Sequence, residues 1–415
     1  MKNLVAFIKF NMQMQKRKSK ELAQALYVDT GYFSRIINQK IKPKNDEIYQ
    51  KLSQLLHLDW DIITEQNDKL DNLFAEYLDA VYFADNNQRN SLYQMINISK
   101  TQCANSPYLF DVMMTSFIQG TISKKYSDEY NSVLVQLLDI YQYFDPNYKQ
   151  IFLVFYLRYL NDHQKFHAIK TIIEQLDGQK FYDEKLEMMF KYYYFSYLNF
   201  DHSTIKSYEI YQSCLKLCKK YNNTKREFYL QMMLASQLTT NKEYQEAIEL
   251  NLHLLSQLEK DNINCGNILN NIAWTYSLMK DHKNALKYYI MCTAYSDEND
   301  LYFNLAWTYF QLGDRKNASK YVEIGQTSKC RLDYFYDLLN WLQAMLNKAY
   351  SLKAHEILED IWKQHHADMS IDMQNFVLIE LMNSCWKNKL YDQYHDISKQ
   401  IINKNSQCMN VIIDD

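Results

Sequence analysis

The feature that most constrains the fold is an internal repeat in the second half of the chain. Residues 271–289 read NIAWTYSLMKDHKNALKYY, residues 304–322 read NLAWTYFQLGDRKNASKYV, and eleven of the nineteen aligned positions are identical at an offset of 33 residues. A fixed period of this size is typical of an array of helical repeats and not of a single compact core. Chance apolar periodicity does not reproduce the shared Asn, Thr and Lys positions, so we interpret the two copies as true repeats.

Small residues recur at matching places in both copies. Ala273 and Ala306 each lie three residues before a tyrosine, and a second alanine, Ala285 or Ala318, follows twelve residues later. This pattern resembles the tetratricopeptide repeat, which is a pair of antiparallel helices. Small residues let such helices approach closely, while large residues fill the gap to the next repeat. The resemblance predicts that each second helix opens near its alanine.

The rest of the chain is poor in helix breakers. Its 415 residues include only six glycines and three prolines, and no strand-like alternation stands out. The eight cysteines form no CxxC pair, which is typical of reduced thiols in a cytoplasmic protein. No apolar run approaches the ~18–20 residues that a membrane span needs. We therefore predict an all-α, cytoplasmic protein with no membrane segment.

Charge is divided unevenly along the chain. Residues 1–57 contain eleven Lys or Arg and four acidic residues, a net charge of +7, so the remainder carries −10. A small basic head on a large acidic body is typical of a polyanion-binding module attached to a carrier with a different function.

Helical spacing in this head predicts a series of short helices. Apolar residues recur at helical intervals in residues 3–16, 19–26, 31–40 and 46–57. Ser19 is a suitable cap for the second of these helices, and either Asp29 or Thr30 for the third.

Residues 19–43, SKELAQALYVDTGYFSRIINQKIKP, resemble the helix-turn-helix of the phage-repressor (XRE/Cro) family. The resemblance covers about residues 3–62 and rests on Val28 in the turn and on Phe33 and Ile36 as core positions. The chain departs from the family at Ile37, where an acidic residue is common, and at Gln39, where glycine is common.

The helix-turn-helix resemblance implies a set of DNA contacts. The third helix would enter the major groove, and Arg35 would then read guanine bidentately. The residues implied to face bases are Thr30, Gly31 and Arg35, and those near phosphates are Ser19, Tyr32, Asn38, Lys40 and Lys42. The alternative interpretation is a basic helical cap on the repeats, with Arg35 as a solvated charge.

The repeats predict a second binding surface. In a tetratricopeptide array the first helix of each repeat lines a concave groove that binds extended peptides. An Asn amide has both a donor and an acceptor, so a row of them can hold a peptide backbone. The register places the following residues on that groove: Asn267, Asn270, Asn271, Trp274, Phe303, Asn304, Trp307, Gln311 and Asn340. Alternatively, the Asn residues cap or cross-link helices, and Trp274 and Trp307 belong to the core between repeats.

No constellation of residues predicts an enzyme. His163 and His167, like Cys214 and Cys218, have the spacing of one helix face, but no third ligand lies nearby in the sequence. We interpret them as ordinary helix residues and buried thiols. Glycine-rich phosphate loops and the common hydrolase and kinase motifs are absent. We therefore predict no catalytic residue, no metal site and no cofactor.

A repressor-type helix-turn-helix followed by tetratricopeptide-like repeats resembles the peptide-sensing regulators of Gram-positive bacteria, the Rgg-, PlcR-, PrgX- and NprR-like proteins. The resemblance implies a DNA-binding domain over residues 1–66 and a right-handed tetratricopeptide-like α-solenoid over 67–415 that binds peptide and dimerises. It also implies a cytoplasmic homodimer on a paired site in double-stranded DNA, with a short signalling peptide in the groove held by asparagines such as Asn271 and Asn304. Two alternatives remain: a repressor without a peptide ligand, and an adaptor whose groove binds a protein partner.

Overall fold

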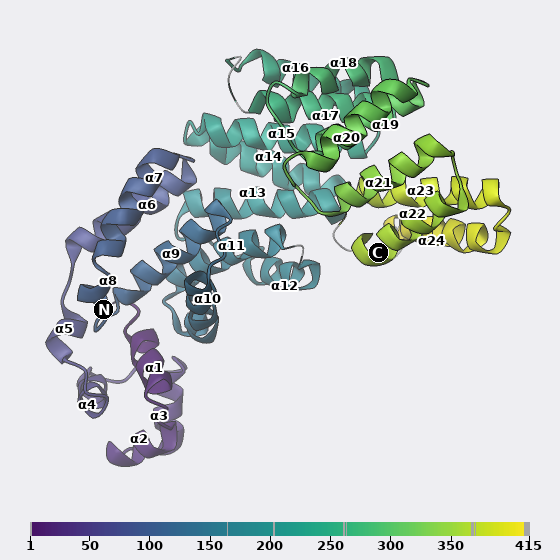
Figure 1. Cartoon of the computed structure of the whole chain (residues 1–415). Coiled ribbons are helices and arrows are strands. Elements are labelled where there is room, and N and C mark those ends of the chain that lie inside the picture. The colour runs from purple at the N-terminus through teal and green to yellow at the C-terminus, as the bar shows by residue number, and fades with distance from the viewer. Residues whose placement is uncertain are drawn as a thin grey trace. The chain divides into compact units, whose positions relative to one another are not determined.

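The structure, a computed structural model, describes residues 2–163, 165–201, 204–259, 262, 264–366, 369 and 371–410 (Figure 1). Within these ranges the regular structure is helical, apart from one isolated bridge between Glu298 and Lys329. The predicted all-α fold is therefore confirmed. No described helix combines the length and the apolar character that crossing a membrane requires. The chain forms two compact units, Met1–Tyr197 with Gln212–Arg226, and Leu198–Tyr211 with Glu227–Asp415.

The first unit begins with five short helices. Their bounds are α1 Leu4–Met14, α2 Ser19–Ala25, α3 Thr30–Ile37, α4 Glu47–Leu55 and α5 Trp60–Thr64. We refer to residues 2–64 as the head. The four helices predicted there are present, and α5 is an addition. The prediction that Ser19 caps its helix was wrong: α2 already includes Ser19, and the cap position is Lys18, which makes no side-chain cap bond.

Longer helices complete the first unit, and we refer to them as its body. They are α6 Asp68–Tyr82, α7 Asn86–Ile98, α8 Lys100–Cys103, α9 Leu109–Ser123, α10 Asp128–Ile140, the 3-10 helix η1 Tyr141–Tyr143, α11 Pro146–Asp162, α12 Phe166–Leu176 and α13 Glu184–Asp201. Local sequence explains several starts. The side chains of Asn67, Asp85 and Ser127 accept backbone N–H bonds at the starts of α6, α7 and α10. Pro146 opens α11 at the position where its missing N–H has no cost.

The second unit continues the series of paired helices. Its helices, of which the first two are shared with the first unit, are α14 Thr204–Lys220, α15 Thr224–Thr240, α16 Tyr244–Ser256, α17 Asn264–Leu278, α18 His282–Cys292, α19 Asn299–Gln311, α20 Arg315–Thr327, α21 Tyr334–Asn347, α22 Leu352–His365, α23 Ile371–Asn388 and α24 Tyr391–Asn410. The two sequence repeats are the pairs α17–α18 and α19–α20, as predicted.

The repeat alanines lie in the cores of their helix pairs. Ala273, Ala285, Ala306 and Ala318 are all fully buried. Each second helix also begins in the same way, because Asp281 and Asp314 accept the backbone N–H of the residue three positions on, at 3.1 and 3.0 Å. The identity between the two copies therefore has a structural cause in both its apolar and its polar positions.

An aromatic and aliphatic core joins the last repeats. Phe303 of α19 is 1% exposed and lies against Phe335 of α21 and Phe376 of α23, with ring centroids 5.8 and 5.9 Å apart. Contacts between α19 and α23 mean that three successive first helices of the array share one core. The packing of this part of the second unit depends on that core.

Replacing Phe303 with alanine tests this packing. We expect Phe303→Ala to lower the free energy of unfolding by about 3–5 kcal/mol, because it removes a buried ring and leaves a cavity. The neighbouring control Asn304→Ala should change it by no more than about 0.5 kcal/mol. Chemical denaturation of the full chain measures both, and equal effects would contradict the assignment of Phe303 to the core.

Candidate functional site

Two short helices of the head pack against each other across a tight turn. Leu22 and Ala23 of α2 and Phe33, Ile36 and Ile37 of α3 are all buried. The turn occupies residues 26–29, where Tyr27 has a left-handed backbone with φ of 55°. Asp29, one of the two predicted caps, holds the start of α3 by accepting the backbone N–H of Tyr32 at 2.8 Å. These contacts give α3 a fixed direction on the head.

The two departures from the repressor pattern have structural explanations. Ile37 is 1% exposed and completes the core of the head, so an acidic side chain would not fit there. Gln39 adopts a left-handed backbone with φ of 56°, the conformation that glycine accepts most easily. The end of α3 therefore keeps the local geometry that a glycine would favour, although this chain has none there.

All eight residues predicted to contact DNA reach the surface of the head. Ser19 and Tyr32 are half-buried, and the others are exposed: Thr30, Gly31, Arg35, Asn38, Lys40 and Lys42. Asn38 also donates to the Ser34 hydroxyl at 3.2 Å. The surface that they form is polar and basic, with Arg35 on the outer side of α3.

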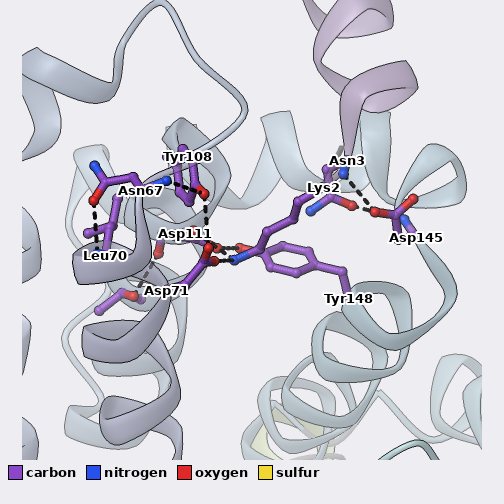
Figure 2. Close-up of polar contacts among 10 residues, drawn as sticks. Lys2, Asn3, Asn67, Leu70, Asp71, Tyr108, Asp111, Asp145 and Tyr148 are labelled. Atoms are coloured by element: carbon purple, nitrogen blue, oxygen red, sulfur yellow. Dashed lines mark hydrogen bonds and ion pairs between the residues drawn. The ribbon is translucent and has the colours of Figure 1, made fainter. Parts of the chain in front are cut away.

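The first residues of the chain join the head to the body of the same unit (Figure 2). The Lys2 ammonium forms ion pairs with Asp71 of α6 at 2.8 Å and with Asp111 of α9 at 2.9 Å. It also lies over the rings of Phe74, Tyr108 and Tyr148, between 5.2 and 5.6 Å from their centroids. We refer to these two acids and three rings as the socket.

Hydrogen bonds connect the socket residues to one another. Tyr148 donates its hydroxyl to Asp111 at 2.7 Å, and Tyr108 donates to Asp71 at 2.9 Å. Burial raises the pKa of the Asp111 carboxyl, and the Lys2 ammonium opposes that rise. Sequence reasoning missed this site, because Lys2 is separated from its two acids by 69 and 109 residues and no local pattern links them.

The predicted groove residues occupy three different environments. Asn267, Gln311 and Asn340 are exposed, and Asn270, Asn271, Trp274, Asn304 and Trp307 are half-buried. Asn271 and Asn304 are equivalent in detail, since the backbone carbonyl of each accepts a threonine hydroxyl one turn later, at 2.8 and 2.7 Å. Asn340 accepts a hydrogen bond from the Gln326 side chain at 3.1 Å.

Phe303 and Trp307 differ from the other predicted groove residues. Phe303 is in the core and is not available to a ligand in this structure, so its placement on an open groove needs correction. Trp307 is half-buried and packs on Trp341 and Phe376, with ring centroids 5.4 and 5.2 Å apart, and this contact favours the core interpretation for Trp307. The cause is long-range: α23 supplies Phe376, which covers this part of α19.

The histidine and cysteine pairs have structural surroundings. The imidazole of His163 lies against the ring of Tyr159 in a tilted arrangement, with ring centroids 4.1 Å apart. Its Nδ1 is 2.8 Å from the Tyr159 carbonyl oxygen. Cys214 and Cys218 are fully buried. A hydrogen bond with Cys218 and burial raise the pKa of the Cys214 thiol well above its ordinary value. Among the described residues, no group of three or more His, Cys, Asp or Glu side chains is placed to hold a metal ion.

The fold is similar to those of known peptide-sensing proteins. A Rap protein complexed with competence and sporulation factor matches with a TM-score of 0.67 and 14% identity, over 83% of this chain and 99% of that one. NprR in complex with its cognate peptide NprX matches with a TM-score of 0.61 and 14% identity, over 81% of this chain and 99% of that one. The apo form of the quorum sensor NprR from B. thuringiensis matches with a TM-score of 0.59 and 13% identity, over 81% of this chain and 98% of that one.

These likenesses establish the fold as a tetratricopeptide-like α-solenoid. The predicted resemblance to NprR-like proteins is confirmed at that level. No protein-family model matches the sequence, and no curated protein resembles it significantly.

The cap of α3 provides a test of the head's local structure. We expect Asp29→Ala to destabilise α3 by about 1 kcal/mol, which is about a fivefold loss of amide exchange protection in that helix. Asp46 is the matched control, because it has the same position before α4 but makes no side-chain cap bond. Asp46→Ala should therefore change protection in α4 much less, and an equal loss in both would contradict the capping role of Asp29.

Proposed function

We propose that this protein is a cytoplasmic transcriptional regulator that binds DNA through its head and a short signalling peptide through its repeats. The peptide changes DNA binding, as in quorum sensing, and the active form is a homodimer on a paired site. The observation that carries the proposal is the combination of the exposed Arg35 of α3 and the exposed Lys40 and Lys42 that follow it with a solenoid of the fold found in peptide-bound NprR.

Support for DNA binding comes from the head. Its net charge of +7 over residues 1–57 contrasts with −10 over the remainder, and a polyanion is the natural partner of such a surface. The helix that would enter the major groove is α3, and Arg35 extends from its exposed side. Lys40 and Lys42 follow in the exposed segment after α3, where they would contact phosphates.

Support for peptide binding comes from the asparagines of α17 and α19. Asn267, Asn270, Asn271 and Asn304 retain surface exposure, while the aromatic residues Phe303 and Trp307 are used in the core. A row of amides, each with a donor and an acceptor, favours recognition of a peptide backbone. The peptide would act by binding two conformational states of the repeat region with different affinities.

DNA binding to genomic fragments around the gene, with and without synthetic peptides from nearby small reading frames, tests the whole proposal. A specific site whose affinity shifts with one peptide is the expected result. Specific binding that no peptide alters would favour the peptide-independent repressor. A lack of any preferred site, together with a stable protein complex, would favour the adaptor.

Arg35 and Lys42 should have different roles on that site. We expect Arg35→Ala to cost about 1–3 kcal/mol and to relax the preference at one base pair, because a bidentate base contact is lost. Lys42→Ala should weaken binding to all DNA sequences equally. It should also reduce the slope of the logarithm of the binding constant against the logarithm of the salt concentration by about one. Titrations on a panel of site variants at several salt concentrations measure both, and an unchanged preference in Arg35→Ala would contradict its assignment.

The two repeat asparagines provide the corresponding test of the groove. In the double variant Asn271→Ala with Asn304→Ala, we expect the peptide-induced shift in DNA affinity to fall by at least tenfold. DNA binding without peptide should be unchanged. The matched control is Asn284→Ala with Asn317→Ala, which removes the same residue type from the same repeats at the starts of α18 and α20. A normal response in the first variant would place the ligand elsewhere.

A further inference from the structure

The head has two separate attachments to the body of the first unit. One is covalent, the short segment 65–67 between α5 and α6. The other is non-covalent. Lys2 enters the socket and Asn3 pairs with Asp145. Farther along the head, Lys9 lies over the ring of Tyr143, and the Gln39 side chain donates to the Tyr143 carbonyl oxygen. A single attachment lets a module swivel, whereas a second one far along the chain restricts its orientation.

The contacts at the second attachment are specific. The backbone N–H of Asn3 donates to Asp145 at 2.6 Å, and the backbone N–H of Asp145 donates to the Asn3 side chain at 2.9 Å. Beyond them, Phe7 and Phe10 of α1 meet the edge or face of Phe110 at centroid distances of 6.2 and 5.8 Å. Reciprocal hydrogen bonds and an aromatic contact together define one docked position.

The socket is built for a cation. The Asp111 side chain is 1% exposed, so its charge is separated from water and depends on Lys2 for compensation. Three rings present their faces to the same ammonium, and cation–π attraction strengthens when the cation is partly desolvated. A buried carboxylate without its counterion is strongly unfavourable, so an empty socket would have to rearrange. Occupied and empty sockets are therefore two discrete states.

We propose that Lys2 is a latch that fixes the orientation of the head on the body, engaged when its ammonium occupies the socket of α6, α9 and α11. The head is oriented while the latch is closed and swivels about residues 65–67 when it opens. Because the socket residues belong to the body, a change in the packing of α6 against α9 alters the latch. This inference concerns the position of the head and does not depend on what the head binds.

Spin labels on the head and body of the full chain test the latch. The labels are introduced by Lys20→Cys on α2 and Gln94→Cys on α7, both exposed, in a background with Cys330→Ser and Cys408→Ser. We expect the distance between the two spin labels to have a narrow distribution in the labelled protein without further changes. In the variant Lys2→Met with Asp111→Asn, that distribution should be at least twice as wide. This pair of changes empties the socket without leaving an uncompensated buried charge, because the remaining acid, Asp71, has a side chain that is 41% exposed to water.

The matched control removes an ion pair that lies wholly within the head. Lys51 and Glu47 are bonded at 2.6 Å and both are more than half exposed, so Lys51→Met with Glu47→Gln should leave the distribution narrow. An unchanged width in the socket variant, with its helix content intact, would overturn the proposal. Loss of folding in that variant would also overturn it, because Lys2 and Asp111 would then be an inseparable part of the core.

Discussion

The close approach of paired helices at their alanines is the constraint on which the repeat region depends. Ala273 faces the start of α18 near Ala285, and Ala306 and Ala318 are arranged in the same way one repeat later. A larger side chain at any of these positions would separate the helices and move every later repeat. The tyrosines and leucines between repeats fill space that this approach defines. The polar residues on the remaining faces are consequently directed outward.

A second constraint comes from the end of the array. Phe376 of α23 reaches both Phe303 and Trp307 of α19, so the first helices of three repeats are locked into one core. Such packing uses aromatic side chains that a repeat considered alone would present to a ligand. Asn270, Asn271 and Trp274 of α17 are half-buried, so these side chains keep part of their surface.

The head depends on the body for its order. Helices as short as α2 and α3 are not stable alone in water, and packing against a neighbour must supply the difference. Within the head, α2 and α3 pack against each other, while α1 lies on Phe110 of the body. The same contacts that stabilise the head thus also position it.

The sequence by itself determined the helical fold, the two sharp repeats and the separation of charge between residues 1–57 and the rest of the chain. Each of these follows from residues that lie within one or two helices of each other. Only the tertiary structure decided that Asp29 and not Thr30 caps α3, that Phe303 is a core residue with Trp307 packed against the same core, and that Lys2 occupies an acidic, aromatic socket. Phe303 aligns with the half-buried Asn270 at the repeat offset, and its contacts with Phe335 of α21 and Phe376 of α23 bury it. The physical reason is that burial depends on partners distant in the chain, which periodicity does not encode.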